Sequence, residues 1–249
     1  MAGRELRIRP LTGIAELREG DDLGGLIAQA ASPGAEEIVV LSQKPVSKAE
    51  GRLRRLAEVE AGQRALEIAA QVDKDPALVE LVLSESRRIV RAARGVLITE
   101  TNSGWVCANA GIDSSNLDEG VVSLLPEDGD ASARRIRGEI AAASGANPAV
   151  VIADSFGRPW RVGQTDVAIG CAGIAPLADW RGRRDQRGRE LAATHIALAD
   201  ELASAADLVR DKDSGVPGAI VAGLGHLVTQ EDGPGAGAIP RAAEDDLFR

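Results

Sequence analysis

The sequence contains no tyrosine and few other aromatic residues, with three tryptophans and two phenylalanines among 249 residues. Leu, Ile, Val and Ala must therefore supply nearly all of the buried apolar surface. The scarcity of aromatic rings argues against a protein that stacks nucleic-acid bases. The formal net charge of −9 points the same way, because a surface that binds nucleic acid or anionic membrane is basic. Small molecules are the expected partners.

Cysteine is also scarce, and the two residues present, Cys107 and Cys171, are too few for a disulfide framework. The N-terminal residues contain no apolar segment typical of a signal peptide, and no run approaches the ~18 apolar residues of a membrane-spanning helix. Hydrophobic residues make up 44% and charged residues 27% of the chain, which is the composition of a folded globular protein. We expect a cytoplasmic protein.

The order of the expected elements predicts a mixed α+β fold, and the turn Asn102-Ser103-Gly104 predicts a β-hairpin that argues against a purely parallel sheet. Short β-branched runs predict further strands. Helical spacing of apolar residues predicts several helices. We expect strands at 37–41, 95–99, 105–108, 148–153 and 217–224, and helices at 52–72, 76–93, 132–143 and 190–209. The acidic, Gly-rich residues 229–249 predict a flexible tail after a domain of residues 1–228.

The common phosphate-binding motifs are missing from the sequence. There is no Gly-x-x-x-x-Gly-Lys-Ser/Thr loop and no Gly-x-Gly-x-x-Gly after a strand, so a nucleotide would have to be held by other groups. The two histidines, His195 in an expected helix and His226 after a strand, have no Cys or Glu at zinc-binding spacing. We interpret both as ordinary surface residues.

Polar segments follow two of the expected strands, where loops commonly carry functional sites. Residues 42–51 contain Lys44 and Lys48, which could offer positive charge to a polyphosphate or could be solvated residues of an ordinary loop. In residues 153–158, Asp154 and Ser155 come together at an expected strand end. A carboxylate beside a hydroxyl can hold Mg²⁺ near nucleotide phosphates, but the same pair also begins many turns.

A third polar segment, residues 109–116, follows the hairpin and concentrates short oxygen-bearing side chains. Such side chains suit a hard divalent cation and equally suit a turn. If Asp113 of this segment converges with Asp154, the two carboxylates would repel each other, and a metal ion would neutralise that repulsion.

A basic island interrupts the acidic chain between residues 179 and 190. Guanidinium groups match carboxylates and phosphates with paired hydrogen bonds, so the island could clamp an anionic substrate. The alternative is a solvated patch paired with the neighbouring acidic residues. The arginines are Arg181, Arg183, Arg184, Arg187 and Arg189.

Five segments, namely 19–23, 47–52, 109–116, 154–158 and 179–191, resemble the coenzyme F420-0:γ-glutamyl ligase family in their order and spacing. The resemblance covers residues 6–225. Asn-Ala-Gly-Ile-Asp at 109–113 and Ser-Lys-Ala-Glu-Gly at 47–51 are together specific enough to outweigh the separate alternatives.

The resemblance implies an enzyme that uses GTP and divalent metal, Mg²⁺ or Mn²⁺ at two sites, to join L-glutamate to coenzyme F420-0 through a γ-glutamyl linkage. A role for K⁺ is left open. The route would pass through an acyl phosphate. The family's own fold is unlike common ligase folds and forms an intertwined homodimer. Some mycobacterial relatives continue into a flavin-binding, reductase-like domain, but this sequence ends at Arg249, so we expect a stand-alone ligase similar to their N-terminal domain.

By position in the family's motifs, Asp113 and Asp154 would bind one metal ion, and Ser155 would help to bind a second where archaeal members have Thr. Ser keeps the hydroxyl ligand. The nucleotide contacts implied by the resemblance are Ile14, Ala15, Glu16, Leu17, Gln43, Lys44, Lys48, Asn116, Arg210, Asp211, Lys212, Asp213, Ser214, Gly215 and Val216.

The loop at residues 210–216 departs from the family's pattern. Archaeal relatives carry a glycine-rich stretch with a metal-binding Glu there, whereas this chain lacks that Glu and one residue is deleted. Asp211 or Asp213 could replace the Glu, or the second metal is held without a third carboxylate. The missing Glu leaves open an alternative function, a GTP-binding protein without ligase turnover. A second alternative is a ligase for another acid such as a folate, because pocket shape and not the motifs decides the acceptor.

Overall fold

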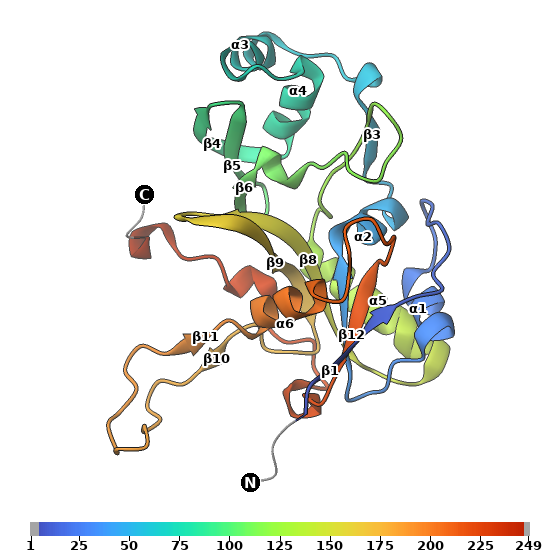
Figure 1. Cartoon of the computed structure of the whole chain (residues 1–249), viewed down its shortest axis with the longest axis vertical. Coiled ribbons are helices and arrows are strands. Elements are labelled where there is room, and N and C mark those ends of the chain that lie inside the picture. The colour runs from blue at the N-terminus through green and yellow to red at the C-terminus, as the bar shows by residue number, and fades with distance from the viewer. Residues whose placement is uncertain (1–4, 247–249) are drawn as a thin grey trace.

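The computed structural model describes residues 5–246, and at its centre lies a five-stranded sheet with the strand order β1-β12-β2-β8-β9 (Figure 1). In this sheet β2 and β8 run parallel, and the other neighbouring pairs are antiparallel. The mixed α and β content expected from the sequence is confirmed. The strands are β1 (Arg7–Leu11), β2 (Ile38–Ser42), β8 (Ala149–Arg158), β9 (Arg161–Ala172) and β12 (Gly218–Ala222).

Helices cover both faces of the central sheet, with α1 and α5 on one face and α6 on the other (Figure 1). Successive side chains of a strand point to opposite faces, and β2 uses this alternation. Val39 and Leu41 pack toward α1 and α5, whereas Ile38 and Val40 pack toward α6. A strand buried on both faces is apolar throughout, as β2 is. The helices are α1 (Leu23–Ala31), α5 (Gly129–Ser144) and α6 (Leu198–Asp207).

A smaller unit with its own apolar core lies next to the central sheet, at the top of Figure 1. It combines the three-stranded sheet β4-β5-β6, the ribbon β3-β7 and two helices. Its elements are β3 (Leu53–Arg55), α3 (Gln63–Val72), α4 (Pro76–Ser84), β4 (Ser86–Ala93), β5 (Val96–Thr101), β6 (Val106–Ala108) and β7 (Val121–Ser123).

The helix expected at 52–72 is wrong over its first half, because only Gln63–Val72 is helical. Residues 53–55 instead form β3 and pair with β7, which lies far along the chain. The Leu-, Arg- and Glu-rich sequence fits a helix locally, and a long-range pairing of this kind overrides such a local preference.

The helix expected at 76–93 is also too long. It begins as predicted, with Asp75 accepting hydrogen bonds from the backbone N–H groups of Ala77 and Leu78, but it ends at Ser84. The following residues form β4, which adds a third strand to the predicted hairpin of β5 and β6. The exposed arginines of β4 are equally typical of the polar face of a helix, so the sequence pattern does not identify the strand when its partner β5 is not known.

The helix expected at 190–209 shortens to α6, and residues 190–197 form part of an extended arm. The arm is closed by pairing of β10 (Ala178–Asp179) with β11 (His195–Ile196) and by a bridge between Arg184 and Glu190. It projects from the body at the lower left of Figure 1. His195, expected in a helix, therefore lies in a strand.

The strand expected at 148–153 is longer than predicted, because β8 continues to Arg158 and pairs with β9 along its whole length. Asp154 and Ser155 lie inside the paired strand and not in a loop after it. Residues of this polar, Gly-containing kind have low strand propensity, and their pairing with β9 places them there. No strand was predicted at 161–172, so the partner that extends β8 was not anticipated.

Residues after 228, expected as a flexible tail, make specific contacts as far as the structure describes them; residues 247–249 lie outside the described residues. The guanidinium group of Arg137 on α5 is 3% exposed and donates to the carbonyl oxygens of Thr229 and Gln230 and to a carboxylate oxygen of Asp232. It also donates to Pro148 O at 2.9 Å. Within residues 5–246, the structure contains no helix with the length and apolar character needed to span a bilayer.

We predict that Arg137→Ala lowers the free energy of unfolding by about 3 kcal/mol, because it removes a buried charge and leaves several carbonyl groups without their donor. Arg134→Ala is the matched control, since Arg134 lies on the same helix, is 42% exposed and lies 3.9 Å from Asp128. Urea denaturation measures both variants. Equal losses would show that the contacts of Arg137 do not hold the C-terminal segment.

Candidate active site

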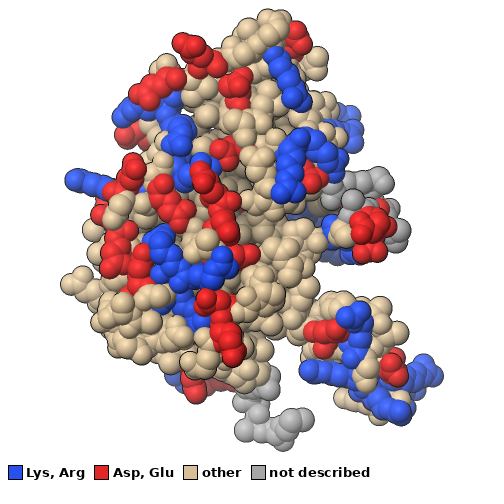
Figure 2. Space-filling view, turned by 180° about the vertical axis from the view of Figure 1, so that it is seen from behind, with Lys and Arg blue, Asp and Glu red and all other residues tan. Residues whose placement is uncertain are grey.

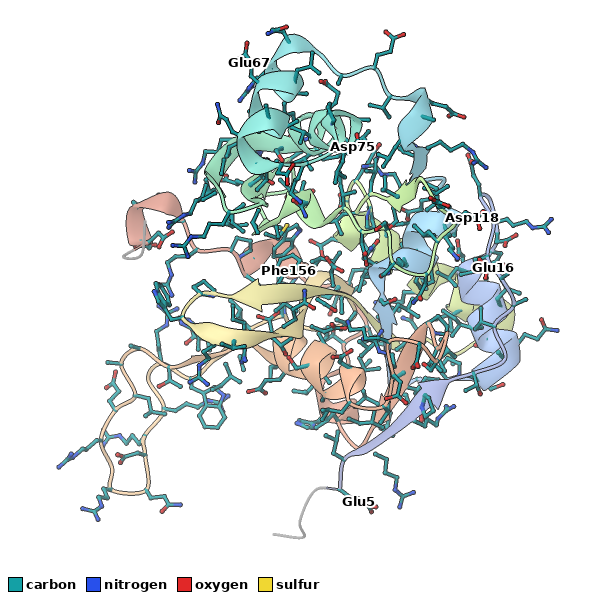
Figure 3. The ribbon with its side chains drawn as sticks, turned by 45° about the horizontal axis from the view of Figure 1, so that its top comes forward. Glu5, Glu16, Glu67, Asp75, Asp118 and Phe156 are labelled. Carbon is teal, nitrogen blue, oxygen red and sulfur yellow. The ribbon has the colours of Figure 1, made fainter. Side chains whose placement is uncertain are left out.

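A cavity of about 1290 Å³ opens where the central sheet meets the smaller unit. It exceeds the roughly 300–1,000 Å³ of typical small-ligand sites. In Figure 3, Glu16 before α1 and Phe156 on β8 are labelled, and both line it. The predicted site residues on its wall are Ile14, Ala15, Glu16 and Leu17 before α1; Gln43, Lys44 and Lys48; Asp113 and Asn116; Asp154 and Ser155; and Arg210, Asp211, Lys212, Asp213, Gly215 and Val216 before β12.

One predicted residue, Ser214, is not part of the cavity wall. Its hydroxyl donates to Asp211 O at 2.7 Å and so stabilises the turn of the loop from within. The other members of that loop line the cavity, together with the predicted residues of 14–17, 43–48, 113–116 and 154–155.

The lysine-bearing segment after β2 is the short helix α2 (Gln43–Ala49), and not the loop that the sequence suggested. Lys44 and Lys48 are four residues apart, which puts them on the same face of α2, toward the cavity. The Lys44 ammonium lies 2.7 Å from the Asp113 carboxylate, and Lys48 pairs with Glu16. The side chain of Gln43 is buried and bonded to Ser47 and Ser123, so it holds α2 against β7.

Asp113 is held by its own segment of the smaller unit. Its backbone exchanges hydrogen bonds with Ser123 at 3.1 and 2.8 Å, and its carboxylate accepts from the N–H and hydroxyl of Ser115, both at 2.8 Å. Burial acts to raise the pKa of Asp113, but Lys44 and Ser115 stabilise the anion more strongly, so this pKa lies below its usual value. Asp113 is therefore ionised at neutral pH.

The backbone before Asp113 is strained. Asn109 and Ala110 have φ values of 52° and 54°, in the left-handed region that non-glycine residues rarely adopt. Gly111 follows at 72°, and a Cβ there would lie 2.6 Å from the Leu125 side chain. Strain of this kind clusters at functional sites, where the surrounding packing maintains it.

Asp154 lies on the cavity wall in the middle of β8. Burial raises its pKa to about 7; the backbone N–H of Ser155 opposes that rise, and the negative charges of Asp166 and Asp113 add to it. Asp113 and Asp154 both line the same cavity, which is the arrangement in which a shared cation would be useful. A cation between them would favour the ionised form of both.

The loop at residues 210–216 contacts the other segments directly. Lys212 donates through its ammonium to the hydroxyl of Ser155, and Asn116 donates through its amide to Lys212 O at 3.0 Å. At the start of the loop, Arg210 forms a buried ion pair with Asp166 of β9. Two predicted nucleotide segments and a predicted metal ligand are thus linked by hydrogen bonds.

Side-chain oxygen atoms on this wall are suitable ligands for a small divalent cation. Asp113, Asp154 and Ser155 supply hard oxygen ligands of the kind that Mg²⁺ and Mn²⁺ prefer. Ammonium groups already lie on two of them, Lys44 on Asp113 and Lys212 on Ser155, so these oxygens attract positive charge. Across residues 5–246, no group of three or more His, Cys, Asp or Glu side chains is arranged to hold a metal ion. Phosphate oxygens and water would have to complete the coordination, as is usual for Mg²⁺ at nucleotide sites.

The arginines of the arm do not reach this cavity within one chain, since no residue of 178–196 lines it. Arg181 is paired with Asp179 at 2.7 Å, and the guanidinium of Arg183 lies 5.0 Å from the ring centre of Trp180. In the view from behind, the arm stands apart from the body at the lower right, with basic side chains on its surface (Figure 2). Substrate binding by these arginines would require a cavity on another copy.

Sequence reasoning missed several residues of the wall, among them Asp166 and Cys107. Asp166 lies in β9, which was not predicted; the alternation of small and apolar residues in 161–172 was the available signal. Burial, with a contribution from Asp154, raises the pKa of the Cys107 thiol to about 12, so it is not a nucleophile at neutral pH. Cys107 and Cys171 are both free, as expected.

We predict that Asp154→Asn stabilises the metal-free protein at alkaline pH. The pKa of this carboxyl is higher in the folded than in the unfolded chain, so folding stability is lost as the pH rises from about 4 to about 7. Well above pH 7 the Asn variant should be more stable by about 4 kcal/mol, and near pH 4 the difference should vanish. Urea denaturation in the presence of a chelator measures this, with Asp118→Asn on an exposed loop as control. A difference that does not change with pH would refute the assignment.

Comparison with known sequences gives a consistent result. The sequence profile of the family described as F420-0:Gamma-glutamyl ligase matches residues 13–223. A protein of Methanothermobacter thermautotrophicus named Coenzyme F420:L-glutamate ligase is 44% identical over 245 residues, which cover 95% of this chain and 96% of that protein. Proteins of the same name from Methanopyrus kandleri and Methanocaldococcus jannaschii are 45% and 40% identical and cover 98% and 92% of this chain and 98% and 90% of their own lengths.

The matched region includes every segment that lines the cavity, from the loop before α1 to β12. More than half of the chain matches the profile, and the relatives align over nearly their full lengths. This chain therefore belongs to the F420-0:γ-glutamyl ligase family.

Proposed function

We propose that this chain is a ligase that joins L-glutamate to coenzyme F420-0 through a γ-glutamyl linkage, using GTP. The observation that carries the proposal is its nearly full-length similarity to proteins named Coenzyme F420:L-glutamate ligase. The cavity supports it, because it combines lysines suited to phosphates with carboxylates suited to a divalent cation and has room for two substrates.

In this proposal GTP lies between the loop before α1, helix α2 and the loop at 210–216. Lys44 and Lys48 turn from Asp113 and Glu16 toward the polyphosphate and neutralise its charge. Asp113 and Asp154 hold one Mg²⁺ or Mn²⁺ ion, and Ser155 contributes to a second. A bound divalent cation would withdraw negative charge from the phosphoryl group that is transferred.

The reaction needs an activated acceptor, because a carboxylate is a poor electrophile. We propose that an acceptor carboxylate oxygen attacks the terminal phosphorus of GTP, which forms an acyl phosphate and releases GDP. The amine of glutamate then attacks the acyl carbon, loses a proton, and displaces inorganic phosphate. The chain's part is to align these groups and to offset their charge, which is where phosphoryl-transfer enzymes obtain most of their rate.

A second candidate function, GTP binding without ligase turnover, is favoured by one observation. The loop at 210–216 lacks the glutamate that the resemblance places there, and Lys212 takes a position on Ser155 instead. Under this alternative the chain would bind GTP but release no glutamate-dependent phosphate.

We also propose that two copies of the chain associate. The arm at 178–196 projects from the body, and Val162 and Trp160 at the β8–β9 turn are 100% and 78% exposed. Large exposed apolar side chains together with a projecting arm are typical of a surface that a second copy covers.

The ligase proposal predicts glutamate-dependent phosphate release from GTP with Mn²⁺ or Mg²⁺, and a mass gain of one glutamyl residue on coenzyme F420-0. Asp113→Asn should lower the rate by about 100-fold or more, because it removes charge needed at the transferring group. Asp118→Asn, on an exposed loop outside the cavity, is the control. GTP binding without a mass gain would favour the second candidate function. A mass gain on a folate but not on coenzyme F420-0 would show that the acceptor is a folate.

The dimer proposal predicts a mass of two chains by light scattering. Val162→Asp should shift the protein toward a single chain without loss of fold, because a fully exposed side chain contributes little to the core of one copy. Leu66→Gln, on the outer surface of α3, is the control and should leave the mass unchanged. A wild-type mass of one chain at micromolar concentration would contradict this proposal.

A further inference from the structure

Asp166 is an almost fully buried carboxylate at the cavity wall, with 2% of its surface exposed. The antiparallel register of β8 and β9 puts Asp166 directly opposite Ser155. The hydroxyl of Ser155 donates to one carboxylate oxygen of Asp166 at 2.6 Å. No motif of the sequence marked this residue.

The other carboxylate oxygen of Asp166 pairs with Arg210, the first residue of the loop at 210–216. Arg210 is 8% exposed, and its Nε–H is buried without a hydrogen-bond partner in the described part of the chain. The backbone of Asp166 is fixed as well, because the hydroxyl of Ser204 on α6 donates to its carbonyl oxygen at 2.8 Å. Asp166 therefore joins β8, β9, α6 and the loop.

The bond from Ser155 to Asp166 determines what Ser155 can do. A hydroxyl has one proton and two acceptor lone pairs, and here the proton is committed to Asp166. The oxygen can then offer only lone pairs to the cavity, where the Lys212 ammonium takes one of them. A cation ligand needs the same orientation. With its proton free to rotate, the hydroxyl would present a donor to the cavity for part of the time.

We propose that Asp166 is a positioning residue of this site: it fixes Ser155 as an acceptor for a divalent cation and, through Arg210, holds the loop at 210–216 against the cavity. This inference rests on the proposed function. Asp166 also supplies a third carboxylate to a site whose loop lacks the expected glutamate. It acts through Ser155 and Arg210 and not as a direct ligand, since both of its oxygens already have partners inside the wall.

The test measures the affinity of the full-length chain for Mn²⁺, with and without GTP. Electron paramagnetic resonance quantifies the Mn²⁺ that remains free. Asp166→Asn should weaken Mn²⁺ binding by about 10- to 100-fold, the usual effect of losing a partner that orients a ligand. Asp200→Asn is the matched control, because Asp200 is a partly buried carboxylate that accepts from Ala168 N on the same strand and does not line the cavity. It should leave Mn²⁺ affinity unchanged.

A double-mutant cycle separates positioning from a general structural role. If Asp166 acts through Ser155, the effect of Asp166→Asn on Mn²⁺ affinity should fall below about threefold in a Ser155→Ala background. The same loss in both backgrounds would overturn the inference. So would wild-type affinity in Asp166→Asn.

A second variant covers the case in which Asp166→Asn fails to fold because Arg210 is left as a lone buried charge. The double variant Asp166→Asn, Arg210→Gln buries no charge, and it should show the same loss of Mn²⁺ affinity. Failure of the proposed function is visible separately, as the absence of a glutamyl mass gain with wild-type protein. If the wild-type chain adds glutamate to the acceptor but binds no Mn²⁺, the inference about Asp166 is wrong while the ligase proposal stands.

Discussion

The carboxylates of Asp113, Asp154 and Asp166 face one partly enclosed cavity, and the negative charge that they concentrate there constrains the rest of the site. Placing anions where water is scarce costs free energy unless positive charge lies close by. The chain compensates two of them with its own cations, Lys44 on Asp113 and Arg210 on Asp166. Within residues 5–246 no cation forms an ion pair with Asp154, and burial raises its pKa to about 7.

This imbalance links stability to function. Carboxylates that bind metal and nucleotide lower the free energy of unfolding when neither is bound. Functional groups commonly reduce stability in this way. The strained backbone at Asn109 and Ala110 is a second cost of the same kind. Burial of apolar side chains in the central sheet offsets this loss of stability, because β2 is apolar on both faces and is covered by α1, α5 and α6.

The sequence predicted the segments of the site better than the architecture that assembles them. Lys44, Asp113 and Asp154 lie in local motifs, and the structure brings them to one cavity. Local sequence patterns do not predict the pairing of strands that are distant in the chain. Residues 53–55 pair with β7, and β9 extends β8 past Asp154. Asp166 was missed for that reason, since its place opposite Ser155 exists only through this register.

The most direct test of the central claim, that this cavity binds metal and GTP with the carboxylates as ligands, is anomalous X-ray diffraction from crystals grown with Mn²⁺ and GTP above pH 7. The account predicts an anomalous peak between Asp113 and Asp154, with Lys44 moved from Asp113 to the phosphates. A peak at another place, or a polyphosphate bound while Lys44 stays on Asp113, would contradict it.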